Sequence, residues 1–122
     1  MNNSVSPLLT VSPQVTKLKP DHIAVYHYGK VQWLHTDEIT HLRGEGNYTY
    51  ITMRSGHKYL ICKTLKTVQA TAQRNFLRVH KSFVINPEHI MIRLEADVLL
   101  MKCGTKVPIA RRRIREMDTL LR

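Results

Sequence analysis

Short β-type segments separated by turn residues run through most of the chain, and this pattern restricts the fold more than any other feature. From residue 21 onward, stretches rich in Val, Ile, Tyr and Thr alternate with turns that contain Gly, Asp or Ser, as in strands joined by hairpins. The predicted strands are 23–28, 31–34, 39–42, 47–54, 58–63, 82–85, 90–94, 98–102 and 107–109, with an irregular or short extended piece at 76–79. The pattern predicts a mainly β domain.

Two stretches have helical spacing instead. After Thr64, a good N-cap, apolar residues recur at i, i+3 and i+7 from Leu65, which predicts a short amphipathic helix. The apolar residues of 111–121 also share one helical face, and Asn86-Pro87 predicts a single helical turn. The 122 residues, 43% of them apolar, support one domain with its own core.

Residues 1–20 differ from the rest of the chain. They are rich in Ser, Thr, Asn and Pro and contain no acid, so we expect a flexible N-terminal arm before a folded domain at 21–122. Scattered apolar residues leave open that this arm docks on the domain or on a partner. We expect no secretory signal at the start of the chain, because it lacks a positively charged n-region and is interrupted by prolines. No apolar run reaches membrane-spanning length. Cys62 and Cys103 lack disulfide or zinc-site spacing, which suits a reduced, cytoplasmic setting.

The charge of the chain indicates its partners. Lys and Arg number 19 against 9 Asp and Glu, a formal net charge of +10. Between residues 39 and 94, nine bases stand against two acids, an imbalance that favours a polyanion. Nucleic acid is the first expectation. An acidic protein or an anionic membrane surface is the weaker alternative.

Motifs for catalysis or metal binding do not emerge. The stretch Gly44-Glu45-Gly46 lacks the remainder of a dinucleotide or phosphate-loop fingerprint and is expected to form a tight turn. The nine carboxylates are scattered without the pairing that acid–base catalysis needs, and the histidines have no metal-ligand companions. We therefore expect no enzyme, no metal and no cofactor.

Three consecutive arginines, Arg111 to Arg113, open the predicted C-terminal helix. Cations at a helix start oppose the helix dipole by about 0.3–1 kcal/mol each. A bound phosphate would offset this cost, because the free N–H groups of a helix start bind anions. Arginine also suits bidentate contact with guanine in the major groove.

Four segments together resemble the LytTR DNA-binding domain of bacterial transcription regulators. They are ITHLRGEGNYTY (39–50), KYLICKTL (58–65), FLRVHKSFVIN (76–86) and KVPIARRR (106–113), within a resemblance that runs from about residue 23 to residue 121. The third segment is the motif most specific to the family. A Pro-(Ile/Val)-x-Arg-Arg motif follows it at the spacing found in the family. The resemblance implies an elongated architecture of stacked antiparallel sheets, whose loops reach two successive major grooves and the minor groove between them.

The resemblance also implies roles for individual residues. The family's base-reading positions match Asn47, Lys81 and Arg111, and their chemistry suits adenine for Asn and guanine for Lys and Arg. The expected phosphate and supporting contacts are Arg43, Tyr48, Arg78, His80, Ser82, Arg112 and Arg113. For Tyr48 a core or cross-strand role stays open, and His80 is expected to orient its segment.

The chain departs from the family's pattern in two places. Ala110 stands where Ser is common, and losing a side-chain cap there would cost about 1 kcal/mol. Many members also carry a receiver domain before the DNA-binding domain. Because only 20 residues precede the domain here, we expect no dimerisation through a phosphorylated receiver.

The sequence thus predicts a sequence-specific regulator of double-stranded DNA. A second copy on a repeated target and a separate sensor or regulatory protein are its other possible partners. The alternative is a small β module for RNA or single strands, with Tyr48, Tyr50 and Tyr59 as a stacking platform. Preference for duplex over single strand distinguishes the two.

Overall fold

The computed structural model describes residues 21–72 and 74–121, so the predicted N-terminal arm lies outside the described residues. The strands are β1 (His22–His27), β2 (Lys30–His35), β3 (Ile39–Glu45), β4 (Tyr48–Met53), β5 (Lys58–Ile61), β6 (Leu77–His80), β7 (Phe83–Ile85), β8 (Ile90–Glu95), β9 (Val98–Met101) and β10 (Lys106–Pro108). The helices are α2 (Leu65–Ala72) and α3 (Ile114–Leu120), with single 3₁₀ turns η2 (Thr36–Glu38), η3 (Pro87–His89) and η4 (Arg111–Arg113).

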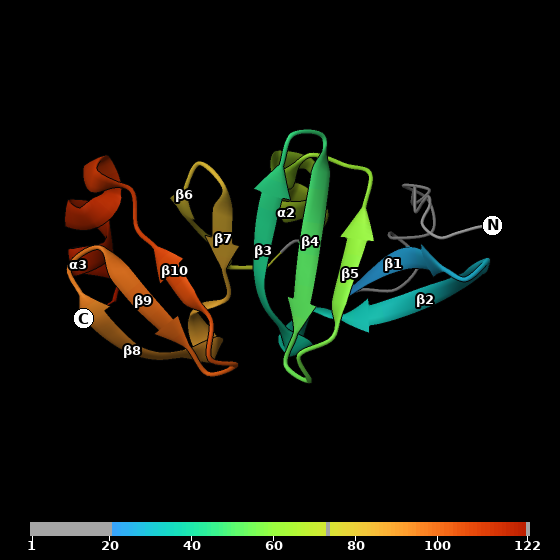
Figure 1. Cartoon of the computed structure of the whole chain (residues 1–122), viewed down its shortest axis with the longest axis horizontal. Coiled ribbons are helices and arrows are strands. Elements are labelled where there is room, and N and C mark those ends of the chain that lie inside the picture. Colours follow the sequence, from blue (N-terminus) through green and yellow to red (C-terminus); the bar gives the residue numbers. More distant parts are fainter. Residues whose placement is uncertain (1–20, 73, 122) are drawn as a thin grey trace.

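These strands form antiparallel sheets that follow one another along the long axis of the molecule (Figure 1). The described residues make a β1-β2 hairpin, a five-stranded sheet in the order β5-β4-β3-β7-β6 and a three-stranded sheet in the order β10-β9-β8. The elongated, mainly β arrangement with two short helices agrees with the expectation from the sequence. The piece at 76–79 proves to be a regular strand, β6, because β7 supplies its hydrogen-bonding partner.

The predicted C-terminal helix over 111–121 is interrupted, which corrects the prediction. Its first turn is the 3₁₀ turn η4, and the α-helix begins only at Ile114. Ala110 stands at the N-cap and makes no side-chain hydrogen bond to the turn. The amide of Arg113 instead bonds the carbonyl of Ala110 at 2.8 Å. This i→i+3 bond is typical of a helix end that tightens when a side-chain cap is missing.

Strand β7 connects two hydrophobic cores. One core packs α2 and the β1-β2 hairpin against a face of the five-stranded sheet, and it contains Val84. The other core packs α3 against the three-stranded sheet, and it contains Ile85. Adjacent strand residues point to opposite faces, so these two fully buried side chains couple the two halves of the molecule.

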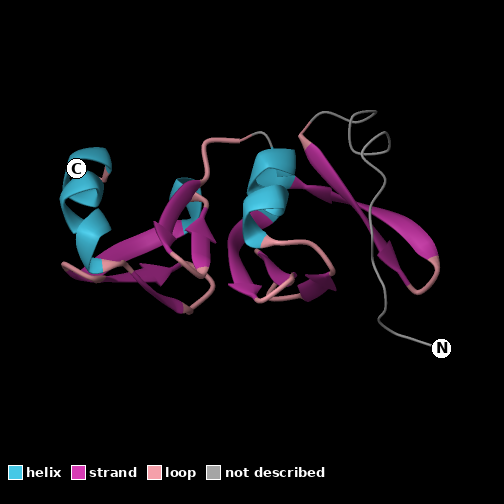
Figure 2. Cartoon of the chain, turned by 90° about the horizontal axis from the view of Figure 1, so that it is seen from above, coloured by secondary structure: helices cyan, strands magenta, loops and turns pink. Residues whose placement is uncertain are grey.

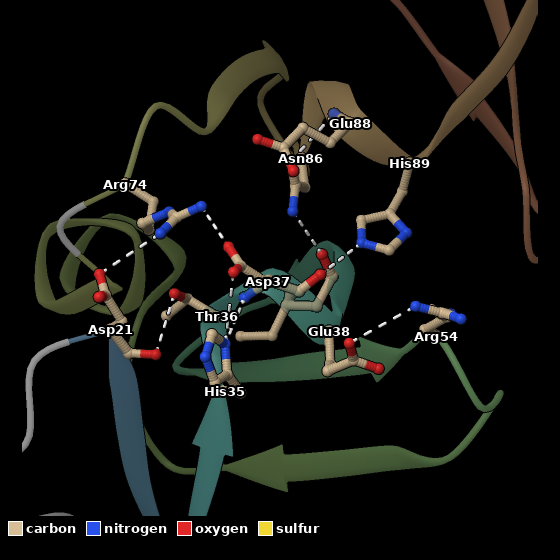
Figure 3. A network of polar contacts seen from close by, with 11 residues as sticks. Asp21, His35, Thr36, Asp37, Glu38, Arg54, Arg74, Asn86, Glu88 and His89 are labelled. Atoms are coloured by element: carbon tan, nitrogen blue, oxygen red, sulfur yellow. Dashed lines mark hydrogen bonds and ion pairs between the residues drawn. The ribbon is translucent and has the colours of Figure 1, made fainter.

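A polar network at the start of β3 reinforces this junction (Figure 3). Asp37 in η2 pairs with Arg74, whose guanidinium also reaches Asp21 at 3.3 Å. His89 in η3 is buried, and its Nε2 lies 2.6 Å from the carbonyl of Asp37. Since a carbonyl only accepts, this nitrogen carries the proton. The network binds the two halves together at the end of the sheet farthest from the β3–β4 turn.

Candidate nucleic-acid interface

Three segments that carry the predicted base-reading residues lie along the same long edge of the molecule. They are the β3–β4 turn, the β6–β7 turn and η4, at the top of Figure 1. The amide of Gly44 donates to the carbonyl of Ser82 at 2.8 Å, which joins the first segment to the second. The amide of Ala110 donates to the carbonyl of Val79 at 2.7 Å, which joins the second to the third. The fold therefore brings together segments whose hydrogen-bonded residues are 38 positions apart (Gly44 and Ser82) and 31 positions apart (Val79 and Ala110) in the sequence.

The β3–β4 turn presents Asn47 to solvent. Gly46 adopts a positive φ of 62°, which glycine tolerates at little cost. The exposed Asn47 follows it at the tip of the turn. At the base, the Arg43 guanidinium pairs with Glu45 at 3.1 Å and stacks over the Tyr50 ring at 4.5 Å. Arg43 is thereby held on the sheet surface, below the tip.

Tyr48 begins β4 beside this tip. Its side chain is 46% exposed, and it belongs to neither hydrophobic core. The core role that the sequence left open for Tyr48 is wrong. Its exposed ring and hydroxyl are available at the edge.

The β6–β7 turn is braced by its own side chains. Arg78 donates from Nε to the carbonyl of His80 at 2.9 Å and from Nη2 to the carbonyl of Lys81 at 2.6 Å. The His80 ring accepts a hydrogen bond from the amide of Ser82 at 3.0 Å. Lys81 is the first residue of this turn and is exposed to solvent. Arg78 and His80 therefore set the shape of the turn that displays Lys81.

At η4, Arg111 and Arg112 are exposed, whereas Arg113 pairs with Glu116 at 3.3 Å. Helix α3 is anchored on its other side, because Met117 is 1% exposed and Asp118 binds Arg93 at 2.6 Å. Within 21–72 and 74–121, no residue forms a hydrogen bond or ion pair with the side chains of Asn47, Lys81, Arg111 or Arg112. The polar groups of these four side chains are therefore available to bind another molecule.

The three tyrosines of the alternative interpretation do not share a surface. In the β4–β5 ladder, Tyr59 lies opposite Ile51 and packs against the core that covers this face of the sheet. Residues opposite each other in a ladder point to one face, and neighbours along a strand alternate. Tyr59 therefore lies on the face opposite Tyr48 and Tyr50, and the predicted stacking platform is not assembled.

Sequence reasoning missed the role of Gly44. It assigned this residue to a turn, but Gly44 lies within β3, where an added Cβ would stand 2.9 Å from Cβ of Leu65. The missing side chain lets α2 approach the sheet, and the same residue bonds Ser82. No local signal in the sequence distinguishes this close approach from a turn glycine.

Strand β3 contains a buried histidine, His41, two residues before Arg43. His41 is 4% exposed, and its Nδ1 lies 2.7 Å from the Thr40 hydroxyl. Burial, with smaller effects of the Lys58 and Arg43 charges, lowers the pKa of His41 from 6.5 to about 4. The ring is therefore neutral at pH 7 and adds no charge to the interface.

The described part of the chain contains no cluster of His, Cys, Asp or Glu suited to a metal ion. None of its helices is long and apolar enough to cross a membrane.

The comparisons with known proteins agree on one family. The LytTr DNA-binding domain family matches residues 29–122. The Sensory transduction protein LytT of Bacillus subtilis (strain 168) is 34% identical over 70 residues, which are 53% of this chain and 29% of that protein. The match thus spans less than a third of that relative's length.

A solved structure is similar over most of the chain. It is the LytTr DNA-binding domain of a putative methyl-accepting/DNA response regulator from Bacillus cereus. The TM-score is 0.71 at 18% sequence identity, and the match covers 84% of this chain and 98% of that one. At this identity the likeness shows the fold, and it confirms the predicted LytTR-like architecture.

The match over residues 29–122 covers well over half of the chain, and it confirms the family inferred from the four sequence segments. Members of this family are DNA-binding regulators and not enzymes. The chain belongs to the LytTR DNA-binding domain family.

Proposed function

We propose that this chain is a transcriptional regulator that recognises a specific sequence in double-stranded DNA through the edge formed by the β3–β4 turn, the β6–β7 turn and η4. Asn47, Lys81 and Arg111 read bases, because all three are exposed and carry the donors or acceptors that base edges require. The observation that carries this proposal is the joining of the three segments by the Gly44–Ser82 and Val79–Ala110 hydrogen bonds.

The neighbouring residues divide into two roles. Arg112, Arg43, Tyr48, Ser82 and Arg113 contact phosphates and fix the register of the protein on the duplex. Arg78 and His80 are positioning residues, since their side chains already bond the β6–β7 turn. A preshaped turn loses less conformational entropy on binding, which favours affinity.

The three segments follow one another along the long axis (Figure 1). Segments spaced in this way suit contact with successive grooves on one side of a duplex. Two copies would occupy a repeated target, each on its own half-site. A separate sensor or regulatory protein is the other partner that we propose.

Fluorescence anisotropy tests the proposal. The full chain is titrated with a random-sequence duplex and with its single strand over a salt series, and duplex binders are then selected from a random pool. We expect duplex preference, a log–log salt slope of several units and an enriched repeated motif. Equal or tighter binding of the single strand without an enriched motif would overturn the proposal.

A further inference from the structure

Helix α2 begins beside the β3–β4 turn (Figure 1). No contact between this helix and DNA was predicted from the sequence. The hydroxyl of Thr49, near the start of β4, donates to the carbonyl of Lys63 at 2.7 Å, and Thr49 is fully buried. The first helical residue, Leu65, packs against Gly44. The start of α2 is therefore fixed to the ends of β3 and β4 that carry Asn47.

Two lysines stand at this helix start. Lys66 is exposed and Lys63 is half-buried, and the first turn of α2 contains no acid. No carboxylate within 21–72 or 74–121 pairs with either lysine. Glu45, the acid of the neighbouring β3–β4 turn, is already paired with Arg43.

The acids of the five-stranded sheet region are mostly at the other end of the sheet. Asp21, Asp37 and Glu38 bind Arg74 and Arg54 in the network of Figure 3. Strand β3, of seven residues, separates that network from the β3–β4 turn by roughly 20 Å. The edge that carries Asn47 and Lys81 is thus the basic end, and Lys63 and Lys66 extend it.

We propose that Lys63 and Lys66 are phosphate-contacting residues that extend the DNA interface from the three base-reading segments onto the start of α2. This inference rests on the proposed function. Figure 2, in which the edge with the three segments faces the viewer, shows α2 and α3 on the same side of the strands. Lys63 and Lys66 at the start of α2 and the arginines of η4 before α3 therefore place basic residues at both helix starts. A lysine ammonium is a flexible point charge that suits a phosphate whatever the base sequence.

The test compares the full chain with three double variants by anisotropy on its selected duplex. Lys63→Ala/Lys66→Ala removes the proposed contacts. Lys102→Ala/Lys106→Ala removes the same charge from exposed lysines around the β9–β10 turn. This turn lies on the long edge opposite the three segments (Figure 1), where the amide of Lys102 donates to the carbonyl of His89. Lys63→Arg/Lys66→Arg keeps the charge at the proposed site.

We expect Lys63→Ala/Lys66→Ala to weaken binding on the order of 10-fold near 0.15 M salt, equally for all duplexes, and to reduce the salt slope by about 2. The control and the arginine variant should stay within about 3-fold of the original chain. Thermal melting checks that each variant is folded, and a variant that fails to fold is replaced by Lys66→Ala alone, for which about half the change in slope is expected.

Three results would overturn parts of this scheme in distinguishable ways. If the unchanged chain shows no duplex preference, the proposed function itself fails. If the chain binds duplex but the α2 variant matches the Lys102→Ala/Lys106→Ala control, the role of Lys63 and Lys66 is wrong and the proposed function stands. If the α2 variant selects a different motif, the lysines read bases and not phosphates.

Discussion

The amide of Ala110 donates a hydrogen bond of 2.7 Å to the carbonyl of Val79. Val79 is fully buried in the second core, so this bond attaches the start of η4 to a rigid strand. The exposed Arg111 follows directly. The base-reading role that we propose for Arg111 needs such a fixed backbone, because misplacement of a contacting group by about 1 Å weakens a site.

Arg111→Ala should weaken binding to the selected duplex by about 1–3 kcal/mol and relax the preference at one base position. The physical reason is the loss of the guanidinium that we propose bonds a guanine edge bidentately. Anisotropy and repeated selection measure the two effects. Arg115→Ala, at an exposed position of α3, is the matched control. A uniform loss over all sequences would make Arg111 a phosphate contact instead.

Arg78→Lys should leave the chain folded but reduce affinity by about 1–2 kcal/mol, because a lysine cannot replace both hydrogen bonds to the carbonyls of His80 and Lys81. The loss should appear mainly as faster dissociation in stopped-flow measurements. Lys retains the positive charge. Binding equal to that of the original chain would therefore show that Arg78 acts by its charge and not by shaping the turn.

Gly44→Ala should destabilise the fold by about 1–3 kcal/mol, since the new methyl group would stand 2.9 Å from Cβ of Leu65 and force α2 away from β3. Urea unfolding measures the change. Thr119→Ala, at an exposed position of α3, should stay within about 0.5 kcal/mol. Unchanged stability of Gly44→Ala would contradict the close packing of α2 on the sheet.

The stability of the fold should depend on pH through His41. Burial, then the Lys58 and Arg43 charges, lowers its folded-state pKa to about 4, below the unfolded value of 6.5. The unfolded chain therefore binds more protons between these pKa values, and the contribution of His41 to stability is complete above about pH 6.5 and is lost as the pH falls toward 4. The expected loss between pH 7.5 and 4.5 is about 2.5 kcal/mol.

His41→Gln isolates this effect from the protonation of carboxylates. Urea unfolding of both proteins from pH 7.5 to 4.5 should show a smaller decrease in the variant, by about the loss assigned to His41. Parallel curves for the two proteins would mean that His41 is not the group that titrates.

Much of the local structure follows from local chemistry. Thr64 accepts the amide of Thr67 at 3.3 Å, and Asn86 accepts that of Glu88 at 3.1 Å, as their places before helical turns predicted. Four hairpin turns, those with Gly29, Gly46, Gly56 and Gly104, also lie where a glycine adopts positive φ. Such signals depend on a few neighbouring residues, so the sequence displays them directly.

The candidate site was partly predictable for a different reason. The resemblance of four segments to one family pointed to the positions that we propose read bases, including Asn47 and Lys81, and the structure shows both of these side chains exposed. The bracing by Arg78, the exposure of Tyr48 and the position of Tyr59 could not be derived in this way. Each depends on strand pairing and on which face of the sheet a core covers.

The sequence by itself determined the mainly β character of the domain, its helix caps, its turns and its basic charge, because each depends on residue type and short spacing. Only the tertiary structure decided that β6 is a strand and that Gly44 allows α2 to pack closely on the sheet. It also decided that the turns with Asn47 and Lys81 lie beside η4. These features need hydrogen bonds and packing between segments far apart in the chain. No local pattern specifies such partners.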